Sequence, residues 1–348
     1  MFSLLYVPHG FIRRHLPRVE RGITALSLAG LVYVLITSLP VFPPFWDGAI
    51  VAAVFLTTLA SPFVGFSLAV LAAFYPISTI SIYLAAIFLA IAILAMRPLT
   101  QHLGATVLVM SAPLLSGYSL GWVIPLLGGL WWGASAGSWI GSLAAFWGML
   151  AAGMAGLNPD WLAHAGQVPP MVAVVERFAG ANSLEALRLL VTPLAPDTTA
   201  LLYNLLQIAV WGIVATVAGN LNDRPNVQNR RPLGGALIAL VGGFTLLGAH
   251  LLFAYWLGQP AAESLDLRIG LMAAATTGVM AAALVMLQDF FEHPLPRPKP
   301  RKPRPAESAP PEPVTGPEPV SPPTQYPPFD PKKQKSQEDL ILLELDEE

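Results

Sequence analysis

The segment Gly133-Ala134-Ser135-Ala136-Gly137 matches G-x-S-x-G, the pattern in which hydrolases hold a nucleophilic serine. Such a serine needs a base, and His250 is the histidine that lies well inside a later apolar segment. The hydrolase motif requires a strained turn between a strand and a helix. Here it lies among small apolar residues typical of a membrane helix, and a run of glycine and alanine explains the match without catalysis. An intramembrane serine hydrolase is therefore the least favoured function.

Other chemistry-bearing residues are scattered. The chain has no cysteine, which excludes disulfides, thiolate nucleophiles and cysteine-ligated metals. It has no H-E-x-x-H, P-loop or dinucleotide-binding motif. The six histidines show no metal-ligand spacing; they are His9, His15, His102, His164, His250 and His293. We predict no catalytic residue, no cofactor site and no metal site, and we expect that the protein is not an enzyme.

Polar residues inside the apolar segments indicate which ions or solutes the protein could bind or transport. His250 is costly to bury as a charged group, so we expect a neutral imidazole that is hydrogen-bonded to a neighbouring helix. The apolar segments lack Asp, Glu, Lys and Arg, which disfavours ion-coupled transport. Two polar stretches, 75–79 and 116–119, remain compatible with a small, weakly charged solute.

Composition indicates which elements must position these residues. Of 348 residues, 54% are hydrophobic and 11% are charged, against about 25% charged in soluble domains. Charged residues are rare up to Leu287 and frequent from Gln288 onward. The net charge of −2 provides no basic field for nucleic acid. The sequence predicts an all-α, polytopic membrane helix bundle with a disordered, proline-rich tail.

Uncharged gaps set the number of membrane spans. The gaps are 48–96, 98–159, 198–222, 232–262 and 269–288. The three shorter gaps each hold one helix, predicted at 201–218, 233–257 and 269–287. The two long gaps hold either two helices each, which gives eight spans, or three short ones with breaks near prolines, which gives ten. We predict eight, because each long gap is about twice a membrane-spanning length plus a turn.

The distribution of Arg and Lys orients the chain, because cytoplasmic loops are enriched in these residues. Basic residues near the N-terminus, in the connection 222–232 and at the start of the tail place all three in the cytoplasm. The predicted organisation is a cytoplasmic segment 1–21, membrane helices 22–156, an extracytoplasmic loop 157–198 with short interfacial helices, three membrane helices 199–288, and a cytoplasmic tail 289–348.

Smaller patterns refine this arrangement. Gly133, Gly137 and Gly141 form a small-residue ridge that predicts close helix packing. In the outer loop, Pro170 is expected to open one short helix, and Asn182 to cap a second. Trp46, Trp161 and Trp256 lie beside predicted outer boundaries, as in an aromatic belt. The stretches 62–68 and 113–120 resemble each other, although apolar sequence often produces such matches.

The tail carries two candidate binding segments. Its beginning is a polybasic cluster suited to anionic lipid headgroups, formed by Arg297, Lys299, Arg301, Lys302 and Arg304. Its end is an apolar patch flanked by acids, suited to docking on a partner, formed by Leu340, Ile341, Leu342, Leu343 and Leu345. A proline-rich spacer separates the two.

These features predict a protein of a bacterial plasma membrane with both termini in the cytoplasm. Its expected partners are the lipid bilayer and a soluble cytoplasmic protein held by the tail, without nucleic acid. The favoured function is a non-enzymatic anchor or scaffold that recruits this soluble partner. The alternative is the membrane component of a small-solute uptake system.

Overall fold

The computed structural model describes residues 9–10, 12–161, 166–228, 233–258 and 267–292, and these residues form helices and loops without a strand. They belong to one compact unit, Met1–Leu295. The all-helical fold class is confirmed. Five helices in this part of the chain are long and apolar enough to cross a membrane, which indicates a membrane protein. They are α2 (Leu16–Ser38), α4 (Pro62–Ile80), α11 (Thr198–Asn222), α13 (Leu233–Trp256) and α15 (Leu267–Glu292).

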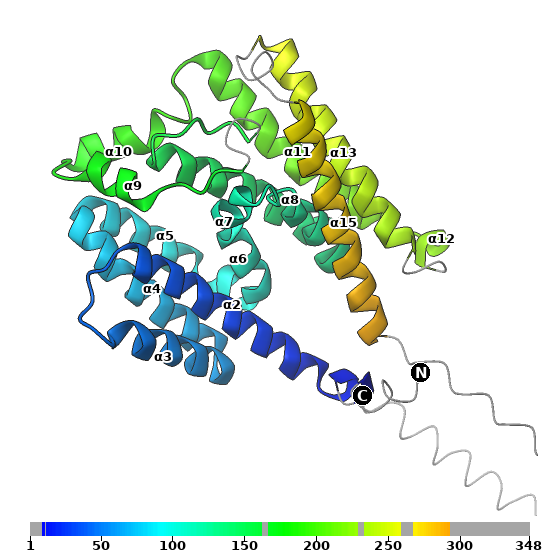
Figure 1. Cartoon of the computed structure of the whole chain (residues 1–348), viewed down its shortest axis with the longest axis horizontal. Coiled ribbons are helices and arrows are strands. Elements are labelled where there is room, and N and C mark those ends of the chain that lie inside the picture. The colour runs from blue at the N-terminus through cyan, green and yellow to red at the C-terminus, as the bar shows by residue number, and fades with distance from the viewer. Residues whose placement is uncertain (1–8, 11, 162–165, 229–232, 259–266, 293–348) are drawn as a thin grey trace, which may run out of the picture. The chain divides into compact units, whose positions relative to one another are not determined.

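Each of the three shorter uncharged gaps holds one helix, as predicted, in α11, α13 and α15. These helices lie side by side (Figure 1). Asp197 caps α11 by accepting a hydrogen bond from the Ala200 amide at 2.8 Å. Small residues bring the helices close together. A Cβ on Gly243 of α13 would lie 2.8 Å from the carbonyl oxygen of Ala274 on α15.

The first long gap is divided among three helices, so the expectation of two helices there is wrong. They are α3 (Trp46–Ala60), α4 and α5 (Ile82–Gln101). Single extended residues, Ser61 and Ser81, separate them. Pro62 explains the first break, because a proline disfavours helical backbone in the residue before it. Pro76 lies inside α4 without ending that helix.

The second long gap is divided further. It holds α6 (Leu103–Met110), α7 (Ala112–Gly117) and α8 (Val123–Met154). Within α8, Gly133 has φ +78° and ψ 178°, which separates a short arm (residues 123–132) from a long arm (residues 134–154). A Cβ on Gly137 would lie 2.7 Å from the Cα of Gly129, so the short arm folds back against the long arm as a hairpin.

Two short helices connect α8 to α11, at the positions that the capping pattern predicts. They are α9 (Met171–Phe178) and α10 (Ser183–Val191). The Asn182 side chain accepts a hydrogen bond from the Glu185 amide at 2.9 Å, which confirms it as the cap of α10. Their buried face packs against the beginning of α5 and the end of α8. A single helical turn, α12 (Pro225–Gln228), follows α11.

The described helices enclose two main apolar clusters. The N-terminal cluster joins α2, α3, α4 and α5 with one face of α6. The C-terminal cluster joins α6, α8, α11, α13 and α15. The C-terminal cluster surrounds the polar side chains described next.

Candidate functional site

The three glycines of the predicted ridge take different roles. Gly133 is the turn of the α8 hairpin, so the expectation of one unbroken ridge is wrong at this position. Gly137 faces the short arm. A Cβ on Gly141 would lie 2.7 Å from the carbonyl oxygen of Trp211, which places the long arm directly against α11. Gly137 and Gly141 therefore hold α8 against two neighbours, its own short arm and α11.

The α8 hairpin sets the depth at which the short arm begins. Gly219 of α11 abuts Ala134, just after the hairpin turn, whereas Gly141 abuts Trp211, two turns earlier along α11. The long arm and α11 are therefore antiparallel. The short arm rises about 15 Å, half the thickness of a bilayer core. Its N-terminal end consequently lies beside the middle of α11 rather than at its end.

An aromatic–histidine cluster occupies this position. The indole Nε1 of Trp211 donates a hydrogen bond to Nε2 of His250 on α13 at 3.1 Å. Trp122, which precedes the short arm, stacks on the same imidazole at 5.6 Å between ring centroids and 11° between planes. A nitrogen that accepts a hydrogen bond carries no proton, so this bond fits a neutral imidazole. The predicted hydrogen bond between His250 and a neighbouring helix is confirmed, and the neutral state of the imidazole stays a prediction that this bond supports.

A buried carboxylate precedes Trp161, whose indole contacts that of Trp211. Asp160 follows α8 and is 3% exposed. Its Oδ1 accepts hydrogen bonds from the Tyr203 hydroxyl and the Gln207 amide, both at 3.1 Å. The Gln207 Oε1 accepts a third bond, from the Trp161 backbone amide at 3.2 Å. Two residues of α11 therefore fix the position of Asp160, and one of them also holds Trp161.

Trp161 connects the carboxylate to the aromatic–histidine cluster. Its indole lies 4.4 Å from that of Trp211 between ring centroids, and its Nε1 donates to the carbonyl oxygen of Ala145 at 3.2 Å. A continuous buried path therefore runs from Asp160 through Trp161 and Trp211 to His250.

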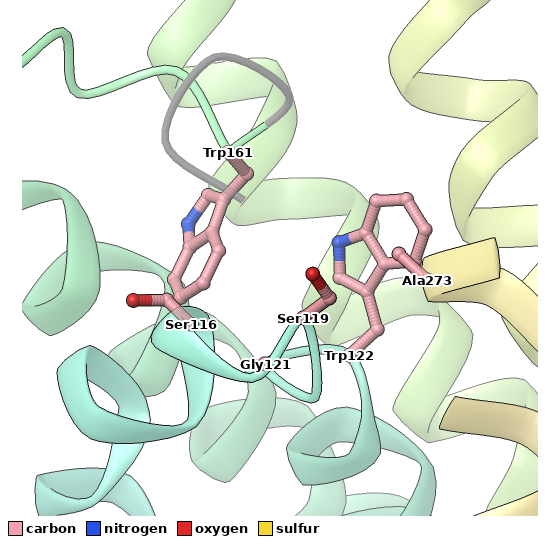
Figure 2. A pocket seen from close by; sticks show the side chains of 6 residues that line it. All are labelled: Ser116, Ser119, Gly121, Trp122, Trp161 and Ala273. Atoms are coloured by element: carbon pink, nitrogen blue, oxygen red, sulfur yellow. The ribbon is translucent and has the colours of Figure 1, made fainter. Parts of the chain in front are cut away.

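A small pocket opens between this path and the turn that joins α7 to α8. It has a volume of about 10 Å³, room for about one water molecule. Figure 2 shows the Ser119 hydroxyl between two indoles, which belong to Trp122 and Trp161. Ser119 has φ +56°, a conformation that a residue with a side chain rarely adopts, and its carbonyl oxygen accepts a hydrogen bond from Thr277 of α15. The remaining lining residues are Ser116, Gly121 and Ala273.

Only one of the two predicted polar stretches reaches this pocket. Ser116 and Ser119 line it. In the other stretch, the hydroxyls of Ser78 and Thr79 donate to carbonyl oxygens of their own helix, α4, at 2.7 Å. The three tryptophans of the predicted aromatic belt differ in exposure. Trp46 and Trp256 are exposed, whereas the belt assignment is wrong for Trp161, which is 2% exposed inside the C-terminal cluster.

The hydrolase pair is not assembled. Ser135 is exposed beside Ala134, which abuts Gly219. His250 is hydrogen-bonded to Trp211. At 1.5 Å per residue, Trp211 lies about 12 Å before Gly219 along α11. This separation gives Ser135 no base in His250. Within the described ranges, no three His, Asp or Glu side chains form a group that could hold a metal ion.

Asp160 is the residue that sequence reasoning missed. It was assigned to an outer loop because it lies beyond the long uncharged gap. A signal existed on α11, where Tyr203, Gln207 and Trp211 recur every four residues and therefore share one face. Such a polar face in an apolar helix indicates a buried polar partner.

The two candidate segments of the tail, the polybasic cluster and the apolar docking patch, lie outside the described residues. Comparison of the chain with known proteins finds no matching family model, no matching curated protein and no matching solved structure.

Proposed function

We propose that this protein is a membrane component that captures or passes a small, weakly charged or uncharged solute. The observation that carries the proposal is the short arm of α8, which begins in the middle of the bundle beside a pocket lined by indoles and hydroxyls. Interrupted helices with buried polar residues at this depth are how transporters build solute sites. An anchor has no need to bury Asp160, Gln207 and His250, each of which costs free energy to desolvate.

The proposed topology has eight crossings and one re-entrant segment, with both termini in the cytoplasm of a bacterial cell. The crossings are α2, α3, α4, α5, the long arm of α8, α11, α13 and α15. Support for the re-entrant segment comes from the short arm, which rises about 15 Å and therefore returns from the middle of the bilayer core, to which α6 and α7 lead. Three crossings in the first gap also place Arg97, near the end of α5, on the cytoplasmic side. The loop that contains α9 and α10 is extracytoplasmic in this arrangement.

Ligand-induced stabilisation tests the proposed function. The full-length protein in mild detergent is heated with a panel of small uncharged and weakly charged solutes. A ligand present at 100 times its dissociation constant stabilises the folded state by about 2.7 kcal/mol, so a match raises the melting temperature measurably. Trp122→Phe should weaken this shift. The exposed Trp46→Phe serves as the matched control and should leave the shift unchanged. A panel that never shifts the melting temperature contradicts the proposal.

The sequence of the tail favours a second function, an anchor that recruits a soluble cytoplasmic protein. The polybasic cluster would bind anionic lipid, and the apolar patch that begins at Leu340 would dock on the partner. Affinity purification of the full chain beside a version that ends at Glu292 tests it. A soluble protein lost together with the tail supports recruitment. An identical set of co-purifying proteins removes the support for it.

A further inference from the structure

We propose that Asp160 is a proton-controlled latch, which as a carboxylate holds Trp161 in the pocket and as a carboxylic acid releases it. The proposal rests on the proposed function, because it assigns proton control to the same pocket. It also changes the expectation about ion coupling. That expectation depended on the absence of buried carboxylates, and Asp160 is one.

The latch consists of hydrogen bonds that join Asp160 and Trp161 to α11. Tyr203 and Gln207 both donate to Asp160 Oδ1, and Gln207 accepts from the next backbone amide, that of Trp161. Asp160 and Trp161 are adjacent, so a change in the first moves the second. The Asn158 side chain, which accepts from the Asp160 amide at 3.0 Å, closes the turn that presents both.

The indole of Trp161 closes one side of the pocket. A Cβ on Gly121 would lie 2.5 Å from the six-membered ring of the Trp161 indole, so the ring rests on bare backbone beside the pocket. The same ring also abuts Gly148 of the long arm. Withdrawal of this indole would widen the pocket without moving a helix.

A proton weakens the latch through elementary hydrogen-bond chemistry. Bonds to an ionised carboxylate are roughly twice as strong as bonds between neutral groups. In the proposed step, a proton from water adds to the Asp160 carboxylate, and no covalent bond of the protein breaks. The acid keeps a carbonyl oxygen as an acceptor but loses the negative charge, so the bonds from Tyr203 and Gln207 to Oδ1 weaken together.

The described residues place the following titratable and charged groups on the elements around Asp160. On α9, the Arg177 guanidinium donates to the Gly153 carbonyl oxygen at the end of α8 at 2.9 Å. On α11 the group is the Tyr203 hydroxyl, and Asp197 caps the same helix further out. His250 on α13 is reached through the two indoles of Trp161 and Trp211. Residues 98–159, which include α6, α7 and α8, contain no charged residue. The α15 residue at the pocket is Ala273. His164, four positions after Asp160 in the sequence, lies outside the described residues.

The absence of cysteine from the chain provides a direct test of pocket opening. Ser116 lines the pocket and is 2% exposed, so Ser116→Cys introduces a single buried thiol with a small change in size. The full-length variant in mild detergent is labelled with a water-soluble thiol reagent from about pH 8 to about pH 5. Ser38→Cys, at an exposed position in α2, corrects for the pH dependence of thiol chemistry itself.

We expect the rate of labelling of the Ser116→Cys variant, divided by that of the Ser38→Cys variant, to rise about tenfold on acidification, because charge-assisted bonds are lost. Asp160→Asn in the Ser116→Cys chain should give the high ratio at every pH. A ratio that stays constant with pH in the chain that keeps Asp160 overturns the proposal, as does an Asp160→Asn protein that labels as slowly as the native latch at high pH.

Tyr203→Phe provides a second variant that retains the titrating group, and it decides the question if Asp160→Asn does not fold. Removal of a donor to the carboxylate destabilises its charged form, so labelling should rise at a higher pH than in the native chain. An unchanged midpoint contradicts the latch. The labelling experiment uses the proton alone as its probe. If labelling rises on acidification but no solute raises the melting temperature, the proposed function is refuted and the latch stands. If a solute raises the melting temperature but labelling does not change with pH, only the latch is refuted.

Discussion

Helices α2–α5 and helices α6–α15 bury different kinds of residue. In α2–α5 the buried polar side chains among the described residues are Thr58 and Ser81, and both form hydrogen bonds within three or four residues of themselves. In α6–α15 Thr106 and Asn204 also bond to carbonyl oxygens at most ten residues away, but other buried polar side chains bond across the bundle over long stretches of chain. Asp160 bonds to Tyr203 and Gln207, and Trp211 bonds to His250.

This difference in hydrogen bonding distinguishes helices that support the bundle from helices that carry a functional site. A hydroxyl that bonds to its own helix costs little in an apolar bundle and joins nothing. A side chain that bonds between helices requires an exact partner, and an unmatched buried group costs about 1–3 kcal/mol. We infer that the N-terminal helices form a supporting wall and that the C-terminal helices carry the site.

The largest expected effect comes from the hairpin of α8. Gly137→Leu would drive a side chain into the backbone of the short arm, and we expect the free energy of unfolding to fall by about 3 kcal/mol or more. Gly30→Leu in α2 is the matched control, because a Cβ there meets nothing within 4 Å. Thermal unfolding in detergent measures both. Equal melting temperatures for the two variants would contradict the folded-back hairpin.

A buried amide provides the next test. Gln207→Leu preserves size but removes the donor to Asp160 and the acceptor for the Trp161 amide, so we expect a loss of about 2–3 kcal/mol. Thr58→Val, in the supporting helices, should change stability by less than about 0.5 kcal/mol. The comparison between the two halves fails if Thr58→Val is as destabilising as Gln207→Leu in chemical unfolding.

The smallest expected effect concerns the imidazole. His250→Phe preserves an aromatic ring beside Trp122 but removes the acceptor of the Trp211 indole, which should cost about 1 kcal/mol. His102→Phe, at an exposed position, should leave the melting temperature almost unchanged. His250→Gln should recover part of the loss, because its side-chain oxygen can accept the same bond. Recovery to the same extent by His250→Leu would argue against the hydrogen bond.

The helices that the sequence located well are those bounded by charges. Asp197 and Asp223 flank α11, and the arginines before α13 mark its beginning, so one helix per gap was the simple solution. Inside the long gaps, boundaries depend on backbone conformation. Pro62 signalled one of them. Ser81 carries no such signal, and neither its type nor its neighbours distinguish it from a serine within a helix.

The site was predictable only in part. The hydrogen bond of His250 to a neighbouring helix followed from the cost of burying an imidazole without a partner. The position of Asp160 did not follow, because a single acid after a helix is equally common in an exposed turn. Its burial depends on Tyr203 and Gln207, which are more than forty residues away in the chain. Such a match is set by tertiary packing and not by local pattern.

The single-residue turn at Gly133 also constrains biogenesis. A segment that enters a bilayer alone must be long enough to satisfy its backbone across the hydrocarbon core, and about 15 Å of helix is too short. The short arm of α8 therefore partitions into the membrane as a pair with the long arm, after the ribosome has synthesised both. Insertion of this region is consequently a concerted event, whose unit is the hairpin and not the individual helix.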